Sequence, residues 1–488
     1  MDFLYLVWNV FFTQFLTVPA LLLGVIVVIG YILLRRPATR VISGGIKTAV
    51  GILILAVGST QLNLTFRPLL EALSKRFGIT GTIIDPYAAL PAANQSLGAN
   101  ASWVGYTILI ALGVNILLVA LTRFTKLRGI FLTGHIMYIQ SALVTAIVSF
   151  TFKLGVVETV LIAGVLTGLY WAIGTHLLIK PVDKITNGAG FTIGHQQMYY
   201  DWIVSKTAHL IGDPEEDDAE NMKLPGWLSI LQDNVVNMAI IMTIFVAALM
   251  FAIGTDTIQK MSGAQHWSVY MLMTGLSFAV NVTIILTGVR MFVAELANSF
   301  KGISERLLKS AVVGVDCPAL FAFSPNAWTL GFLATIIGQL VAIASLVIFR
   351  SPSLIIAGFV PLFFDGGTVG VFSNRHGGVK AVFFFGIMLG LFQVFGSALI
   401  IPLTGMVGGW MGNFDWATVW LVITSILHLI AGLFGVGGST VATQMAPLGN
   451  FVAIFGLLIS AIIFTVVLVV RRGQKPAASD AKLAGNQM

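Results

Sequence analysis

The chain of 488 residues is 57% hydrophobic and only 10% charged, which excludes a soluble globular protein, where charged residues make up about a quarter of the total. Its net charge of +7 comes from short Lys/Arg clusters at the ends of apolar runs, with no continuous basic face, so a nucleic-acid partner is not expected. The single cysteine, Cys317, excludes an internal disulfide and a cysteine-based zinc site. We therefore expect a polytopic membrane protein.

Apolar runs of about 20 residues predict eleven transmembrane helices. No basic segment of a cleavable signal precedes the first run, so we expect the first helix to be retained. Basic clusters such as 35–40, 123–128 and 471–475 fall on alternate ends of the helices, and all can be cytoplasmic if the N-terminus is outside and the C-terminus inside. The predicted helices lie near 9–34, 43–64, 101–121, 129–150, 155–178, 236–256, 268–294, 327–349, 354–373, 380–402 and 449–470.

A further apolar run, 417–436, would place the last basic cluster outside if it crossed the membrane, so we expect it to be re-entrant or interfacial within 406–471. Residues 179–235 are expected to form a polar cytoplasmic segment. Its acidic run, 213–220, is interpreted as a solvated turn, with a docking patch for a basic partner as the alternative. We expect residues 472–488 to be a disordered cytoplasmic tail.

Three blocks recur in the same order along the chain and indicate an internal repeat. The blocks beginning at Asp85, Asn100 and Arg128 resemble those beginning at Asp316, Asn326 and Pro352. The first copy, 1–178, has five predicted helices, so the second copy, 236–405, must be inserted upside down. Interrupted segments at 65–100 and 311–325 occupy matching positions, as in transporters whose solute sites lie near the membrane midplane. We expect an all-α membrane protein of two inverted five-helix repeats plus a last helix, in which these segments meet.

Asp316 is the only acidic residue between Glu305 and Asp365 and lies in an otherwise apolar run. A carboxylate at bilayer depth normally faces the protein interior or a wet cavity, so Asp316 is a candidate solute contact. The alternative is that it caps the N-terminus of a half-helix, where the helix dipole favours a negative charge. Pro318 and Pro325 break the run, which favours a site over an ordinary spanning helix.

Two histidines stand in similar settings, each after a glycine and before amide side chains. Histidine and glutamine donate and accept hydrogen bonds, which suits a polyhydroxylated solute, whereas a core histidine satisfied by a neighbouring helix is the alternative. The candidates in these two settings are His135 with Gln140, and His195 with Gln196 and Gln197. No HExxH, GxSxG or Walker A motif is present, so catalysis by this chain, a cofactor or a metal is not expected.

Several blocks resemble the ascorbate (vitamin C) permease family, the IIC components of the sugar phosphotransferase system, from near the N-terminus to about residue 415. They are IKTAVGILILAVGS, DPYAA, ASWVGYT, RGIFLTGHIMY, GFTIGHQQ, LPGWL and GVRMFVAEL. The resemblance implies a homodimer of eleven-helix protomers in the bacterial inner membrane, each with a scaffold domain and a core domain that carries the solute by an elevator movement. It also implies cytoplasmic IIB and IIA partners, of which IIB phosphorylates the solute on arrival.

The resemblance places solute contacts on Ser59, Pro86, Tyr87, the segment from His135 to Ile139, His195, Gln196 and Asp316. Family members associated with ascorbate have a hydroxyl residue where Pro86 stands and a glutamine where Ile139 stands. Gln140 or Gln197 could supply the missing amide, and a related sugar acid or lactone stays open as the solute. An ion-coupled symporter in which Asp316 titrates is the alternative function, while a membrane-embedded enzyme lacks a catalytic constellation.

Overall fold

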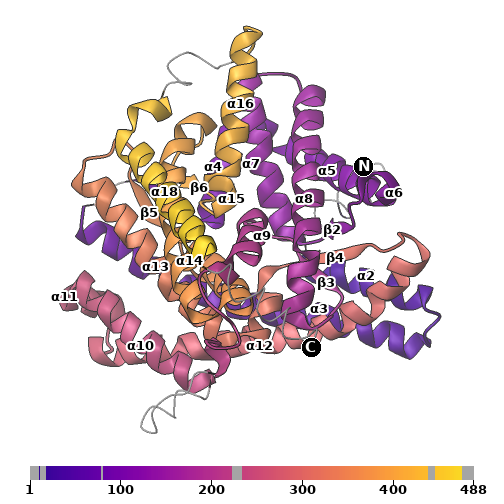
Figure 1. The fold of residues 1–488 in the computed structure, drawn as a ribbon, viewed down its shortest axis with the longest axis horizontal. Coiled ribbons are helices and arrows are strands. Elements are labelled where there is room, and N and C mark those ends of the chain that lie inside the picture. The colour runs from indigo at the N-terminus through magenta and orange to yellow at the C-terminus, as the bar shows by residue number, and fades with distance from the viewer. Residues whose placement is uncertain (1–9, 11–17, 79–80, 222–233, 438–445, 475–488) are drawn as a thin grey trace.

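The computed structural model describes residues 10, 18–78, 81–221, 234–437 and 446–474. For a few helical residues within these ranges, Ser59 and His135 among them, it describes the backbone and not the side chain. The described chain is mostly helical, with six short strands near its centre (Figure 1).

The helices before the polar segment are α2 (Pro19–Leu33), α3 (Ala38–Arg76), α4 (Pro86–Leu97), η2 (Gly98–Ser102), α5 (Trp103–Ala120), α6 (Thr122–Thr125), α7 (Gly134–Phe152) and α8 (Val156–Thr186). The polar segment holds α9 (Met198–Thr207), η3 (Ala208–Leu210) and η4 (Ala219–Asn221). The later helices are α10 (Asn234–Ile253), α11 (Thr255–Ser262), α12 (Trp267–Arg306), η6 (Cys317–Phe323), α13 (Pro325–Ile348), η7 (Pro361–Asp365), α14 (Gly366–Thr404), α15 (Phe414–Ala417), α16 (Val419–Leu433), η8 (Ala446–Gly449) and α18 (Phe451–Gln474).

Helices α2, α3, α10 and α12 pack on one another in the lower part of Figure 1 and are called the scaffold bundle here. Where α3 crosses α12, a Cβ on Gly51 would lie 2.8 Å from the Gly288 carbonyl oxygen, so the crossing requires glycine. The Glu295 carboxylate joins three of these helices, because it accepts from the Tyr31 hydroxyl at 2.6 Å and lies 2.9 Å from Arg40 Nη2.

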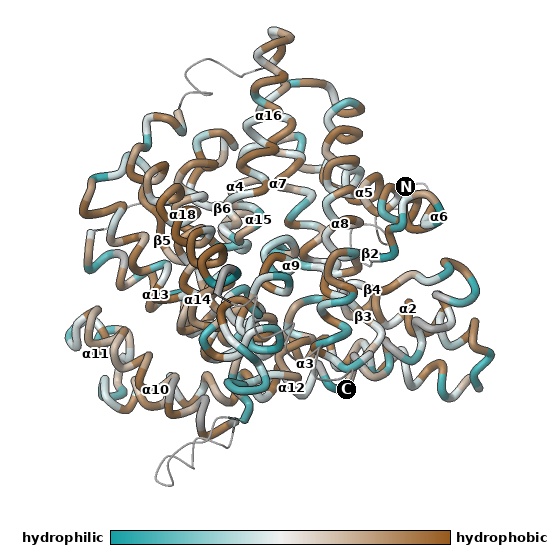
Figure 2. The backbone as a smooth tube through the Cα atoms, in the orientation of Figure 1, coloured by the Kyte–Doolittle hydropathy of each residue, from teal (hydrophilic) through white to brown (hydrophobic). Residues whose placement is uncertain are grey.

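The remaining large helices form a second group, called the core bundle here. Within it α13 packs along α14, α5 along α8, and α7 contacts both α4 and α8. Its apolar residues cover the helix surfaces, while hydrophilic residues gather at the loops (Figure 2). The two bundles touch mainly through α12 against η6 and α10 against α13.

Six strands form two parallel sheets, with orders β5-β1-β6 and β2-β4-β3. Each central strand comes from one half of the chain and its two neighbours from the other half. The expectation of an all-α fold was wrong in this detail, because strands of two to four residues inside apolar runs are too short to show a period of two. The strands are β1 (Thr82–Ile84), β2 (Gly129–Phe131), β3 (Phe191–Ile193), β4 (Val312–Val315), β5 (Ile355–Ala357) and β6 (Gly409–Trp410).

Eight helical stretches of the described residues are long and apolar enough to cross a membrane, which confirms a multi-pass membrane protein. They are Ala38–Leu73, Pro86–Ala120, Val156–Thr186, Trp267–Leu296, Pro325–Ile348, Pro361–Thr404, Phe414–Leu433 and Phe451–Arg472. The pair Met242–Ile253 and Thr255–Ser262, bent by 109°, is one more candidate span, and Ala20–Leu33 and Ile136–Phe152 are shorter apolar helices. The count of eleven stays a prediction.

Several predicted helices differ from the observed elements. The predicted helix 129–150 begins with β2, and 354–373 holds β5 and η7 before α14 begins at Gly366. Helix α14 then continues through 380–402, with an interruption at Gly378, where φ is 71°. The run 417–436, expected to be re-entrant or interfacial, lies mostly in α15 and α16, whose combined length is sufficient for a span. Residues 222–233 of the polar segment and 475–488 of the expected tail lie outside the described residues.

The acidic run 213–220 folds against the core bundle instead of standing free in solvent. Glu220 accepts from the backbone N–H of Ala327 at 2.9 Å and from the Ser324 hydroxyl at 3.0 Å, which caps α13. Asn374 of α14 donates to Asp218 at 2.7 Å. Burial raises the pKa of Glu220, and these hydrogen bonds oppose that shift. The solvated-turn interpretation therefore holds only for the exposed acidic side chains of the run.

Candidate solute site

A cavity of about 820 Å³ lies between the scaffold bundle and the core bundle. Its wall includes residues of α2, α3 and α12 on one side and of α4, α5, α7 and η7 on the other. Both interrupted segments reach it, one through Pro86 and Tyr87 and the other through Asp316 and Cys317. The volume is within the range of about 300–1,000 Å³ that is usual for small-molecule pockets.

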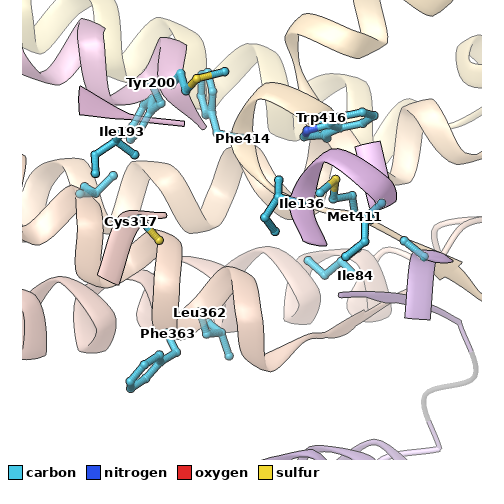
Figure 3. Packing of buried hydrophobic residues seen from close by; sticks show 14 of the residues in the cluster. Ile84, Ile136, Ile193, Tyr200, Cys317, Leu362, Phe363, Met411, Phe414 and Trp416 are labelled. Carbon is cyan, nitrogen blue, oxygen red and sulfur yellow. The ribbon is translucent and has the colours of Figure 1, made fainter. Parts of the chain in front are cut away.

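Asp316 follows β4 directly and begins η6. Its Oδ1 accepts a hydrogen bond from the backbone N–H of Cys317 at 2.8 Å, so the half-helix cap that the sequence left as an alternative is present. The same residue lines the cavity and is only partly buried. Capping and solute contact are therefore compatible roles for this carboxylate. Cys317, from the same turn, lies among buried apolar residues that include Ile193 and Leu362 (Figure 3).

Asp85 holds the equivalent position after β1, at the start of α4. Its Oδ1 accepts from Tyr87 N at 2.9 Å, and its Oδ2 accepts from Val360 N at 3.1 Å. The second bond ties the first interrupted segment to the residues that precede η7. Asp85 is buried and absent from the cavity wall, so it positions Pro86 and Tyr87, which do line the cavity.

The sheet β2-β4-β3 explains why distant residues meet at this cavity. Ile193 of β3 pairs with Val315 of β4, and the strands run parallel, so the residues after them, Gly194 to Gln196 and Asp316, leave the sheet at the same edge. Thr133, which follows β2, donates from its hydroxyl to the Gly194 carbonyl at 2.6 Å. This bond holds the glycine before His195 close to the start of α7.

His195 is fully buried and is one of the residues that line the cavity. Its Nδ1 lies 3.1 Å from Gln196 Oε1, and its Nε2 lies 3.8 Å from Asp365 Oδ1. Nε2 has no hydrogen-bond partner among the described residues. A buried ring nitrogen left open beside a cavity is well placed to bind a solute hydroxyl.

Gln140 and Gln197 lie behind the wall and do not line the cavity. Gln140 accepts from Trp171 Nε1 at 2.6 Å and donates to the His195 carbonyl at 3.4 Å. Gln197 donates to Asp201 Oδ1 at 3.1 Å and to the Asp365 carbonyl at 2.9 Å. Their amides are used to hold the loop that carries His195, so neither replaces the family glutamine at the cavity surface.

The structure thus brings six of the ten predicted site residues to one cavity: Pro86, Tyr87, Ile139, His195, Gln196 and Asp316. Gln140 and Gln197 lie one layer behind. The side chains of Ser59 and His135 lie outside the described residues, although the backbone places both in helices, α3 and α7, that border the cavity. That these residues contact a solute stays a prediction.

Four polar wall residues were missed from the sequence, Thr60, Ser102, Tyr106 and Thr133, while Tyr138 lies within the predicted segment from His135 to Ile139. Ser102, Tyr106 and Thr133 lie inside the blocks that carry the family resemblance, so a helical-face analysis of those blocks would have found them. Thr60 carries no signal beyond a hydroxyl on an apolar helix, which is common in membrane helices.

A group of buried acids also went unnoticed. Asp365 accepts from Asn413 at 2.7 and 2.8 Å and from Gln393 at 2.9 Å, directly behind His195. Asp415 accepts from the Tyr170 hydroxyl at 2.8 Å. Among the described residues of the cavity wall, Asp316 is the one Asp, Glu, Lys or Arg.

Residues 14–417 match the family model described as the PTS system sugar-specific permease component (EIIC-GAT). A curated relative, the ascorbate-specific PTS system EIIC component of Mycoplasma pneumoniae, is 34% identical over 446 residues, which cover 80% of this chain and 66% of that protein. The chain therefore spans slightly less than two thirds of the relative's length. The family match and the cavity between interrupted segments lead to one conclusion: this chain belongs to the sugar-specific permease (IIC) components of the phosphotransferase system.

Proposed function

We propose that the chain translocates L-ascorbate, or a closely related sugar acid or lactone, across the membrane. The observation that carries the proposal is the cavity in which Tyr87 and Asp316, from the two interrupted segments, converge with His195 and Gln196, which follow β3. These side chains offer the mixed donors and acceptors that a ring bearing several hydroxyl groups requires. The name of the Mycoplasma pneumoniae relative supports ascorbate in particular.

The proposed contacts are Ser59, Pro86, Tyr87, His135, Ile139, His195, Gln196 and Asp316. Gln140 and Gln197 are assigned an indirect role, because both amides are bonded behind the wall. Pro86 and Ile139 are the positions where this chain has no polar group. A solute hydroxyl facing Ile139 would lack a hydrogen-bond partner, so a related sugar acid or lactone stays the alternative to ascorbate.

The division into two bundles supports an elevator movement of the core bundle along the scaffold bundle, in a homodimer joined through the scaffold. The strand exchange supports two inverted repeats, because β1 and β2 come from the first copy and β4 and β5 from the second, and each copy supplies the central strand of one sheet and a flanking strand of the other. We place the N-terminus outside and the C-terminus in the cytoplasm, with eleven spans per protomer. Phosphorylation by a cytoplasmic IIB protein, itself served by IIA, then prevents return of the solute.

Uptake of labelled ascorbate by membrane vesicles tests this function. We expect accumulation of ascorbate phosphate only when phosphoenolpyruvate and the soluble phosphotransferase proteins, IIA and IIB included, are inside the vesicles. The alternative is an ion-coupled symporter in which Asp316 is the coupling carboxylate. Accumulation of unmodified ascorbate driven by a proton gradient, without IIB, would favour that alternative and contradict the proposal.

A further inference from the structure

Three side chains on the cavity wall carry the donor atoms of a transition-metal site. A ligand nitrogen of His195, a carboxylate oxygen of Asp316 and the sulfur of Cys317 all lie within 4.8 Å of one another. All three residues line the cavity, so an ion that enters with solvent can reach them. In a tetrahedral zinc site, with bonds of about 2.0–2.3 Å, ligand atoms are roughly 3.3–3.8 Å apart. The side chains therefore need to close by about 1 Å.

His195 is oriented as a metal-binding histidine usually is. With Gln196 Oε1 accepting at 3.1 Å, the ring proton is held on Nδ1 and Nε2 presents a lone pair. Nε2 is buried, has no hydrogen-bond partner within the described part of the chain, and lies 3.8 Å from Asp365 Oδ1. Nε2 and Asp365 Oδ1 are both acceptors, and a proton or a cation nearby stabilises two acceptors that face each other at this distance.

The charges of the group suit a divalent ion. Asp316 and a Cys317 thiolate supply two negative charges, and His195 is neutral, so the loaded site carries no net charge. The described cavity wall has no lysine or arginine that would repel the ion. The Cys317 thiol proton leaves to solvent when the metal binds.

The donor types select the ion. A thiolate and an imidazole favour zinc, cobalt(II) and cadmium over magnesium and calcium, which prefer oxygen ligands alone. Three protein ligands leave the fourth position open to the cavity, as in accessible zinc sites. The single cysteine excluded only zinc sites built from several cysteines. A mixed set of one histidine, one aspartate and one cysteine needs only one.

We propose that His195, Asp316 and Cys317 bind a zinc-like divalent ion in the solute cavity and that the bound ion competes with the solute. The proposal that the ion binds depends only on these three side chains. The competition rests on the proposed function, because His195 and Asp316 are also proposed solute contacts. A bound ion occupies His195 and Asp316, which then cannot contact the solute, so metal binding inhibits transport.

Titration of the purified full chain with Co²⁺ tests the binding step, because a thiolate ligand gives an intense charge-transfer absorption in the near ultraviolet. We expect this band in the wild type, its loss on addition of Zn²⁺, and its absence in Cys317→Ser. The affinity for Zn²⁺ should fall at least tenfold in Cys317→Ser and stay unchanged in His209→Ala, a control at an exposed histidine absent from the cavity wall. Cys317→Ala is the second variant if serine is not tolerated at this buried position. A wild type without the band, or equal Zn²⁺ affinity in the cysteine variants, would overturn the proposal.

Competition is measured by ascorbate titration with and without saturating Zn²⁺. We expect Zn²⁺ to raise the apparent Kd for ascorbate at least tenfold in the wild type and, at the same Zn²⁺ concentration, by a clearly smaller factor in Cys317→Ser. An unshifted Kd in a protein that shows the cobalt band would refute the competition. A protein that shows the band and binds neither ascorbate nor a related sugar acid or lactone would instead refute the proposed function and leave the metal site standing.

Discussion

Gln140→Leu tests whether this residue acts from behind the cavity wall. The substitution keeps the size of the side chain and removes its amide, which joins Trp171 of α8 to the backbone of His195. The buried indole N–H of Trp171 then has no partner, at a cost of about 1–3 kcal/mol in stability. The bond to the His195 carbonyl is long, at 3.4 Å, so its loss should cost about 1 kcal/mol in solute binding, or roughly a fivefold increase in Kd.

The assay pairs thermal unfolding of the purified protein with an ascorbate titration. We expect Gln140→Leu to lower Tm and to weaken binding by that modest factor. Gln339→Leu is the matched control, since it removes a buried amide bonded to Gln393 at 2.8 Å and absent from the cavity wall. It should lower Tm and leave the affinity unchanged. An unchanged Tm with abolished binding in Gln140→Leu would show that its amide contacts the solute directly, against the geometry described above.

Three further predictions follow from the site, the scaffold and the polar segment. Asp316→Asn should weaken ascorbate binding at least tenfold and leave the oligomer intact in gel filtration; unchanged affinity would make the carboxylate purely a cap. Gly51→Ala should lower Tm, because its Cβ would lie 2.8 Å from the Gly288 carbonyl oxygen, while Gly113→Ala, with open space around it, should not; equal values would refute the close crossing. Burial raises the pKa of Glu220 above 4.5, so its favourable contribution is complete below that pH and is lost as pH rises through the folded-state pKa. The Tm of the wild type relative to Glu220→Gln should therefore fall across this range, and a pH-independent difference would contradict the sign.

The membrane class was accessible from sequence because it depends on long apolar runs. Prolines indicated a break in each of the segments 65–100 and 311–325, although in the first segment α3 continues to Arg76 and α4 begins at Pro86. Asp85 and Asp316 illustrate this. Each follows an apolar stretch and precedes a proline-containing turn, and in the structure each caps the helix that follows a central strand. The strands themselves were missed, since two to four apolar residues inside a longer apolar run give no signal of their own.

Side-chain direction was the second limit. Ile139 lines the cavity, and Gln140, one residue further along α7, is turned by about 100° towards α8, so adjacent residues have different roles. Sequence reasoning could place the pair near the site and could not decide which one faces it. The sequence also placed a helix end at 373 and a helix start at 380, whereas α14 runs through this stretch with a break at Gly378.

The account depends most on the position of the solute, and an experimental structure of the purified protein with saturating ascorbate would show it directly. We predict density for one ascorbate molecule in the cavity, within hydrogen-bond distance of His195 and Asp316 and beside Tyr87. Density at any other place, or an empty cavity under conditions in which binding is measured, would contradict the account.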